Sequence, residues 1–463
     1  MNRPRSGFKR GAAPSVPVAR LEPATPAMRL VADDRFGWLT AAIIGLLIVY
    51  LTVPDGLDYS VKDEIDTGSA ATKVLWIGLF AVSVLLILWR GSLAVLLAGR
   101  TNLFIFAFIA LAAFSVLWSI EASFTLKRTF RLLTFLAAAA SFCLVGWHER
   151  RFQNVVRPIL TLLMAGSLIF GMLSPELAIE QSEQAELMGA WHGLAMQKNS
   201  LGALAGIGTI LWLHAGLARE VSALRALLGG LLCGACLVLS RSSTSLMATA
   251  FAMLLLVMVL RASGSLRPYL AYLVTMFTAL LLLYSLAVLH LVSGLDFVLT
   301  PITAMTGKDL TFSGRTAIWD IINEHISMRP LLGSGYGAYW IGPIPGTPSY
   351  EFVDRLAFYP SQSHNGYLEI VNDLGLAGGL CLLGFLIVYV RQSLALMKSD
   401  QLQAALYLSL FFQQLIGNLS EARWFLSTSV DFAIMIIASV ALARALLNQR
   451  LLELARSPTV HRP

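Results

Sequence analysis

The chain has 463 residues, of which 57% are hydrophobic and 13% are charged, and its mean hydropathy is +0.71. A soluble chain carries about 25% charged residues, so this composition leaves too few polar side chains to cover a water-exposed surface and excludes an ordinary soluble domain. The net charge of +7 does not indicate nucleic-acid binding, because the basic residues fall in short loops between apolar runs and no basic stretch is interleaved with aromatic residues.

The N-terminal segment differs from the rest of the chain. Residues 1–36 are rich in Arg, Pro and Ala and cannot bury an apolar face, so we predict a disordered basic tail. The first apolar run begins near Gly37, which is too far along the chain for a typical signal peptide, and no clear small-residue cleavage site follows it. We therefore predict that this run is retained as a membrane helix.

The chain has twelve apolar runs in all, each close to the roughly 17–25 residues that cross a hydrocarbon layer. Each must be helical, because lipid offers the backbone no hydrogen-bond partners. The predicted fold is therefore an all-α, polytopic integral membrane protein with about twelve transmembrane helices. The predicted spans are residues 37–53, 73–89, 103–119, 129–147, 155–173, 200–217, 222–240, 243–260, 268–292, 366–390, 402–418 and 425–446.

The distribution of Lys and Arg predicts the orientation. With both termini in the cytoplasm, the cytoplasmic segments, including a tail at 447–463, hold about 22 of the 34 basic residues and the outer segments about 12, in keeping with the positive-inside rule. Between the nine helices of residues 37–292 and the three of 366–446, residues 293–365 then form a long outer loop, which we expect to be ordered. Within it, residues 316–328 predict an amphipathic helix on the bilayer surface, which Ser313 can cap.

The cysteines and histidines do not indicate a metal or redox centre. Cys143, Cys233, Cys236 and Cys381 lie inside apolar runs, and we interpret the C-x-x-C pair as small residues at a helix contact. The histidines and acids show no metal-ligand spacing, so we predict neither a metal nor a cofactor. The glycines of residues 333–337 lack the Gly-Lys-Ser/Thr ending of a phosphate loop and instead predict a turn.

The polar residues that stand out gather on the predicted outer side, although they are scattered along the sequence. A site built from several loops would produce this pattern. The residues concerned are Trp191, His192, Lys198, Asn199, Arg241, Arg315, His364, Glu421 and Arg423.

Two of the three arginines among these residues each have two interpretations. Arg241 lies in a short turn between apolar runs, where it could reach lipid headgroups or bind an anion through its planar fork of donors. Arg315 lies in the first turn of the predicted loop helix, where the helix dipole disfavours a cation and open N–H groups favour an anion. Alternatively, Arg315 could form a structural ion pair with Asp320 or Glu324.

His364 directly precedes the tenth predicted span. A neutral imidazole there could accept a proton, and a structural histidine at the membrane interface also fits. Glu369 and Asp373 lie one turn apart inside that span. Because acids inside a membrane are usually paired, we expect these two to orient Arg or Asn neighbours rather than react.

Several segments of the chain resemble the O-antigen ligase and polymerase superfamily of bacterial envelope enzymes. They are residues 197–202, 239–242, 313–319, 329–337, 363–369 and 374–378. Each is weak alone, but their order around a long outer loop is fairly specific. The aromatic run at residues 337–340 looks most like exopolysaccharide polymerases of the ExoQ type.

The resemblance implies a GT-C-like, metal-independent glycosyltransferase of the bacterial inner membrane. Its donor would be a glycan on undecaprenyl pyrophosphate and its acceptor a sugar hydroxyl. By motif match, Arg241 and Arg315 would hold the pyrophosphate, and His364 would assist the acceptor hydroxyl as general base or orienter. Further residues are expected to bind substrate: Lys198, Asn199, Trp319, Asn365 and Glu421.

Three functions stay open at this point. The first is a polymerase that extends lipid-linked repeat units into exopolysaccharide or O-antigen, working with membrane lipid and with a chain-length regulator or export complex. The second is a ligase that places the glycan on lipid A-core or on a protein. The third is a polysaccharide or lipid transporter, for which the sequence offers no internal repeat.

Overall fold

Helices make up the regular secondary structure wherever the chain is described. The computed structural model describes residues 35–54, 57, 59, 70–181, 187–262, 267–288 and 315–456. Within these ranges, the only β-type pairing is an isolated antiparallel bridge between Ile179 and Trp191. The all-α prediction is confirmed. Most of the predicted N-terminal tail, the predicted cap Ser313 and the start of the predicted outer loop lie outside the described residues.

The helices follow the predicted spans closely in position. Each predicted span overlaps a helix, but the prediction missed α4, began α6 at residue 129, and ended α18 at residue 446. The helices in chain order are α2 (Gly37–Thr52), α3 (Ala70–Trp89), α4 (Gly91–Ala98), α5 (Leu103–Phe114), η2 (Ser115–Leu117), α6 (Ala122–Leu144), α7 (Arg151–Leu173), α8 (Pro175–Ala178), α9 (Lys198–Leu217), α10 (Ala223–Leu239), α11 (Ser243–Arg261), α12 (Arg267–Val288), α14 (Arg315–Met328), η5 (Pro348–Tyr350), α15 (Glu351–Leu356), α16 (Gly366–Met397), α17 (Gln401–Gly417) and α18 (Val430–Arg456).

Fewer helices than predicted are long and apolar enough to be clear membrane crossings among the described residues. Among the described residues, α3, α7, α9, α11, α16 and α18 are long and apolar enough to cross, and α4 with α5, bent by 95°, would add a seventh crossing. With 16 and 17 residues, the apolar helices α2 and α10 lie at the short end of the roughly 17–25 residues that cross a hydrocarbon layer. In α6, Lys127, Arg128 and Arg131 occupy the first half. The chain is a multi-pass membrane protein, but twelve crossings are not confirmed.

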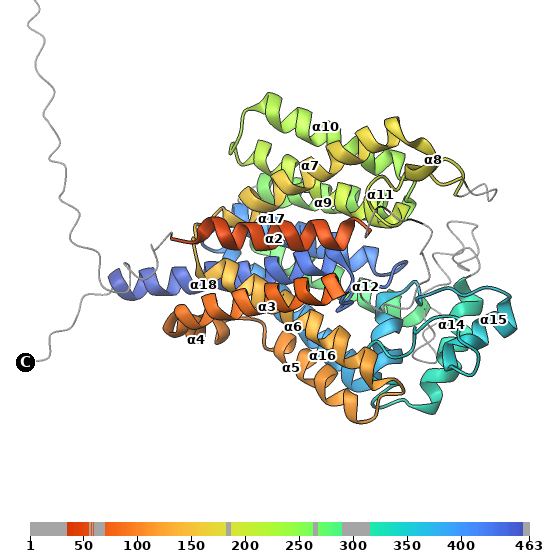
Figure 1. Cartoon of the computed structure of the whole chain (residues 1–463). Helices are drawn as coiled ribbons and strands as arrows, with labels where there is room; N and C mark the ends of the chain where they lie inside the picture. Colours follow the sequence, from red (N-terminus) through yellow and green to blue (C-terminus); the bar gives the residue numbers. More distant parts are fainter. Residues whose placement is uncertain are drawn as a thin grey trace, which may run out of the picture.

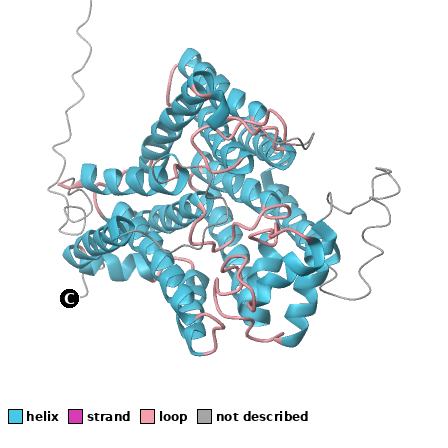
Figure 2. Ribbon diagram, turned by 45° about the vertical axis from the view of Figure 1, so that its right-hand side comes forward, coloured by secondary structure: helices cyan, strands magenta, loops and turns pink. Residues whose placement is uncertain are grey.

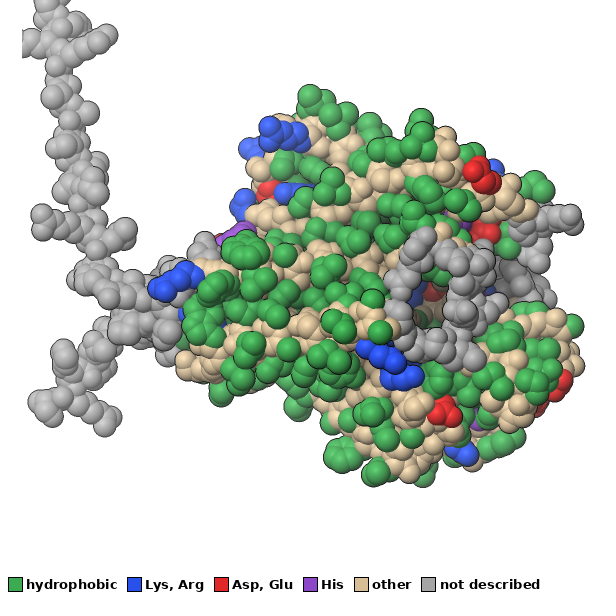
Figure 3. Space-filling view, in the orientation of Figure 1, with side chains coloured by type: hydrophobic (Ala, Val, Ile, Leu, Met, Phe, Trp, Pro, Cys, Tyr) green, Lys and Arg blue, Asp and Glu red, His purple; other side chains and the backbone are tan. Residues whose placement is uncertain are grey.

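The helix α18 lies at the centre of the bundle. It is apolar and buried nearly all round, and it packs against α6, α16, α17 and α2. Beside it, α9 packs against α10, α11, α17 and α7 (Figure 1). Figure 2 shows the described part of the chain as helices joined by loops. By contrast, α3 exposes Val74, Leu85 and Leu88, and Figure 3 shows hydrophobic side chains spread along the sides of the helices. Such apolar outer faces fit contact with lipid.

Small polar side chains fix where several helices begin. The side chains of Asn102, Ser222, Ser242, Asn365 and Asp400 accept hydrogen bonds from backbone N–H groups in the first turns of α5, α10, α11, α16 and α17. Such caps satisfy donors that have no partner within the helix. Two of the capping residues directly follow the candidate site residues at positions 241 and 364. Both candidates therefore lie at the start of a helix.

The long helix α16 is broken at Gly375, where φ is 59° and ψ is −156°. The break deprives the carbonyl groups of Asn372 and Asp373 of their helical partners. Backbone N–H groups of the glycine-rich segment 330–337 donate to them instead, at 3.2 and 2.9 Å, and Leu376 donates back to the start of that segment at 2.8 Å. The glycine-rich segment therefore serves as a backbone partner for a broken membrane helix and fixes the position of the half that begins at residue 366.

We predict that Gly375→Ala destabilises the protein. A Cβ at this position would lie 2.3 Å from the backbone of Leu331, and the positive φ would be strained for alanine. We expect a loss of about 1–3 kcal/mol or more, seen as a lower unfolding temperature in detergent. Gly379→Ala on the same helix is the matched control, because its Cβ would make an ordinary 3.5 Å contact with Val371. Equal unfolding temperatures for the two variants would contradict the broken-helix geometry.

Candidate functional site

The site lies where the first turns of α9 and α14 meet the segments that precede α16 and α18. Asn365, which caps α16, joins two of these segments. Its Oδ1 accepts hydrogen bonds from the N–H groups of Tyr367 and Leu368 at 3.0 and 3.1 Å, and its Nδ2 donates to the Leu419 carbonyl at 3.1 Å. The start of α16 is thereby fixed to the loop between α17 and α18.

The turn that carries His364 is held from two sides. The indole of Trp319 donates to the Ser363 carbonyl at 2.9 Å, and the Ser363 N–H donates to Glu369 at 2.9 Å. His364 itself has a φ of 53°, in the left-handed region that side chains other than glycine adopt at a cost. Its side chain is 24% exposed. The turn therefore presents the imidazole in a strained but well-supported conformation.

The carboxylate of Glu421 is the centre on which the candidate residues converge. Its Oε1 accepts a hydrogen bond from Asn199 at 2.6 Å and a longer one from Arg315 at 3.4 Å, and its Oε2 accepts from Gln362 at 3.2 Å. Nδ1 of His364 lies 3.8 Å from the same Oε1, beyond hydrogen-bond distance but close enough for an ion pair when the imidazole is protonated. Three segments that are far apart in the sequence thus meet at one carboxylate.

Glu421 is ionised at neutral pH although it is buried. Burial by itself raises the pKa of this carboxyl, but the neighbouring His364 and the charges of Arg423 and Arg315 outweigh it and bring the pKa to about 2. The site therefore holds a fixed negative charge. Any cationic form of its neighbours is stabilised by that charge.

Only some of the hydrogen-bond donors of Arg315 have partners within the protein. It is the first residue of α14 and its side chain is 24% exposed. One Nη donates to the Ser420 carbonyl and the other makes the 3.4 Å contact with Glu421. A guanidinium carries five N–H donors, so these bonds leave donors for a ligand.

Arg423 ties the site to the core. One Nη pairs with Asp431 in the first turn of α18, and the other donates to the backbone carbonyl of Asn199 at 2.9 Å. Neither Asp431 nor Gln362 was predicted from the sequence. An acid inside an apolar span is a usable signal for Asp431, because such residues are usually paired. Gln362 lies in a polar loop where no pattern marks it.

Arg241 lies in the turn between α10 and α11, with a φ of 49°. Its Nη1 donates to the Met188 carbonyl at 2.5 Å. The turn packs against the first turns of α9, because a Cβ on Gly202 would lie 2.8 Å from Oγ of Ser240. No hydrogen bond or ion pair joins Arg241 to Glu421 in the part of the chain that the structure describes. Arg241 therefore borders the site without entering its central cluster.

The predicted site residues thus fall into three groups. Arg315, His364, Asn199 and Glu421 come together, and Lys198 lies beside Asn199 at the start of α9. Arg241 is at the rim. Trp319 and Asn365 are 4% and 1% exposed, and their side chains hydrogen-bond to backbone groups around the His364 turn. Both residues therefore support the turn. Direct contact of these two with substrate stays a prediction.

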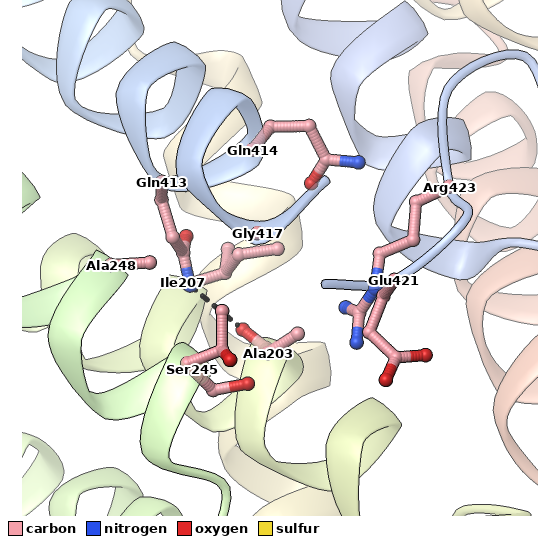
Figure 4. A pocket seen from close by; sticks show the side chains of 10 residues that line it. Ala203, Ile207, Ser245, Ala248, Gln413, Gln414, Gly417, Glu421 and Arg423 are labelled. Atoms are coloured by element: carbon pink, nitrogen blue, oxygen red, sulfur yellow. Dashed lines mark hydrogen bonds between the residues drawn. The ribbon is translucent and has the colours of Figure 1, made fainter. Parts of the chain in front are cut away.

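A cavity adjoins the cluster between α9, α11 and α17. Figure 4 shows Glu421 and Arg423 on one side of it, facing the helices that carry Ser245 and Gln413. Among the described residues, no three His, Cys, Asp or Glu side chains are grouped so that they could hold a metal ion. The arrangement therefore offers fixed charges, hydrogen-bond donors and one imidazole as its chemical groups.

One protein family and one known protein are similar to this chain. Residues 226–383 match the family described as O-Antigen ligase. The chain is also 28% identical over 285 residues to the exopolysaccharide production protein ExoQ of Rhizobium meliloti (strain 1021), and this alignment covers 60% of the chain and 61% of the relative. The alignment therefore spans less than two thirds of that relative.

The family match covers part of the candidate site. Arg241, Arg315 and His364 lie within the matched residues, whereas Glu421 lies beyond them. The resemblance in the sequence motifs and these two similarities agree. Together they support the resemblance to the O-antigen ligase and polymerase superfamily.

Proposed function

We propose that this protein is a glycosyltransferase that joins oligosaccharide repeat units, carried on undecaprenyl pyrophosphate, into an exopolysaccharide or O-antigen. The observation that carries the proposal is the convergence of Arg315 and His364 on the ionised Glu421 at one end of a membrane bundle. A cation and an imidazole held together suit the transfer of a sugar from a charged leaving group to a hydroxyl. The similarity to a protein named for exopolysaccharide production supports the polymerase.

In the proposed reaction, the acceptor hydroxyl oxygen attacks the anomeric carbon of the donor glycan while the bond from that carbon to the diphosphate breaks. The hydroxyl proton passes to His364, and the bonding electrons leave with undecaprenyl diphosphate. Arg315 and Arg241 stabilise this negative charge through their planar N–H donors. A single displacement of this kind inverts the anomeric configuration.

Glu421 has a positioning role in this proposal rather than contact with substrate. Its two oxygens are already occupied by Asn199, Arg315 and Gln362. When His364 takes the proton, the imidazolium forms 3.8 Å from a carboxylate that is always charged, which favours the transfer. The same carboxylate holds Arg315 beside the place where the leaving group departs.

A ligase is the second candidate, because residues 226–383 match a family described as O-Antigen ligase. The donor chemistry would be the same. The acceptor would then be lipid A-core or a protein, and the product would carry one transferred glycan rather than a growing chain.

The proposal includes an orientation in the bacterial inner membrane. The end of the bundle with α14 and α15 faces the periplasm, where lipid-linked glycans are assembled, and both termini lie in the cytoplasm. The bias of Lys and Arg toward the predicted cytoplasmic segments supports this orientation. Residues 293–365 would then be a periplasmic unit between two groups of membrane helices.

Cysteine labelling tests this orientation. Asp354 on α15 and Lys398 at the end of α16 are both exposed, at opposite ends of the proposed topology. With Cys381 replaced by Ser, Asp354→Cys should react with a membrane-impermeant thiol reagent in intact spheroplasts. Lys398→Cys should react only after permeabilisation. The reverse pattern would place the site on the cytoplasmic side and overturn the proposed orientation.

Substitution of Arg315 tests the donor site. Arg315→Lys keeps the charge but loses the planar fork, so it should impair transfer nearly as much as Arg315→Ala. Loss of one charge-assisted hydrogen bond is worth about 1.5–3 kcal/mol, or roughly a tenfold to hundredfold lower rate. The assay measures glycan extension by purified protein with a lipid-linked donor.

The matched control for Arg315 is Arg355→Lys on α15. Arg355 is an exposed arginine that pairs with Glu324 and Glu351, and its substitution should leave the rate unchanged. Adding EDTA should also leave the wild-type rate unchanged. Loss of activity in EDTA that a divalent ion restores would refute metal-independent transfer.

Substitution of His364 tests the general base. Removing a general base lowers the rate by about 10²–10⁴-fold, so His364→Ala should abolish polymer formation while the protein still reaches the membrane and binds donor lipid. His364→Gln can accept a hydrogen bond but cannot take a proton, so it should rescue little. His148→Gln, at an exposed position, is the control. Near-normal turnover of His364→Gln would contradict the general-base role and would mean that the histidine only orients the acceptor.

A further inference from the structure

The apolar side of α14 is not available to lipid, because it packs inside the protein. Its buried large side chains are Ile318, Trp319, Ile321 and Ile322. Exposed apolar side chains follow directly after the helix instead. Met328, Leu331 and Leu332 are 75%, 66% and 45% exposed, although they lie close together in the chain. We call residues 328–332 the apolar turn.

The apolar turn continues a stripe of exposed apolar side chains on α16. Leu376 donates a hydrogen bond to the Pro330 carbonyl at 2.8 Å, which joins the turn to that helix. From this contact onward, side chains that are between 40% and 56% exposed recur along α16 at helical spacing. They are Leu376, Leu380, Leu383 and Ile387. Because α16 is long and apolar enough to cross the membrane, this stripe faces lipid.

The position of this contact along α16 lies at the depth of the hydrocarbon layer. Arg391 is exposed, and it is the first charged residue after the stripe. At 1.5 Å per residue, a layer about 30 Å thick takes about 20 residues of helix. Counted back from Arg391, that length extends to about residue 371. Leu376 and the backbone that it contacts therefore fall inside the layer.

The carbonyl groups of the apolar turn have the partners that hydrocarbon requires. Each carbonyl of residues 329–332 accepts a hydrogen bond from another part of the protein. In order along the turn, the donors are the N–H groups of Gly333, Leu376 and Ala377, at 3.0, 2.8 and 3.2 Å, and the indole of Trp118, at 3.0 Å. Lipid supplies no donors, so irregular backbone lies at membrane depth only where the protein satisfies it.

The neighbours of the apolar turn are typical of a membrane interface. Trp118 directly follows η2, and an indole that donates at one edge while its ring stays apolar suits the boundary between lipid and water. Phe114 and Leu117, just before it, are 64% and 82% exposed. Arg329 is the one charged residue of the turn and is exposed, so its long side chain can reach headgroup phosphates.

We propose that the apolar turn is inserted among the acyl chains of the leaflet next to the candidate site and anchors α14 to the bilayer. A second copy of the chain could also cover an apolar face, but continuity with the stripe of α16 and the satisfied carbonyl groups favour lipid. The insertion is independent of the proposed function. Under that function, it would hold Arg315 of α14 at the membrane surface, where a lipid-linked diphosphate lies.

Fluorescence quenching in nanodiscs tests the insertion. The full-length protein, with Cys381 replaced by Ser, carries an environment-sensitive dye on Leu331→Cys. Lipids with brominated acyl chains should quench this dye, and iodide in the water should not. Leu380→Cys on the stripe is the matched lipid-facing control and should behave in the same way. Asp354→Cys, exposed on α15, is the control for water and should show the reverse pattern.

The position of the dye decides the outcome. Quenching of Leu331→Cys by iodide, as at Asp354→Cys, would overturn the insertion. Protection from both quenchers would also overturn it and would identify a protein cover such as a second copy. Unfolding temperatures close to that of the parent protein establish that each variant is folded, and Met328→Cys replaces Leu331→Cys if the latter fails this criterion. Because glycan transfer is not the readout, the proposed function stands or falls separately.

Discussion

The fold around the site depends on the compensation of one buried negative charge. A carboxylate taken out of water must be hydrogen-bonded and paired, or it will take up a proton. Glu421 stays ionised because Asn199, Arg315 and Gln362 reach it from α9, from α14 and from the turn before α16. These segments are far apart in the sequence. Satisfying one side chain therefore fixes how the ends of several membrane helices are placed, and it places His364 beside that charge.

Buried backbone groups of α16 also need hydrogen-bond partners. Its break at Gly375 exposes carbonyl groups that no lipid can satisfy, and the segment 330–337 supplies the missing partners. The glycines of that segment allow the close backbone approach, since a Cβ on Gly333 would lie 2.5 Å from the backbone of Asp373. The half of α16 between this contact and Asn365 is thereby held at both ends. The turn with His364 is attached to that half.

The sequence predicted much of the central cluster but little of its support. Arg315, His364 and Glu421 could be found because polar residues are rare in so apolar a chain and gather on one predicted side of the membrane. Gln362 could not be found, because a polar residue in a polar loop carries no signal. The break at Gly375 was also hidden, since glycine is common in membrane helices. The number of crossings is not confirmed, because apolar length alone does not distinguish a full span from a short or bent helix.

The proposed function is the formation of glycosidic bonds, and a reconstituted system tests it directly. Purified protein in liposomes would be given an undecaprenyl-diphosphate-linked oligosaccharide, with no nucleotide and no ion gradient. The account predicts glycans that grow by whole repeat units, with one undecaprenyl diphosphate released for each bond formed. Unchanged glycan length, together with movement of the labelled lipid from one leaflet to the other, would contradict it and identify a transporter.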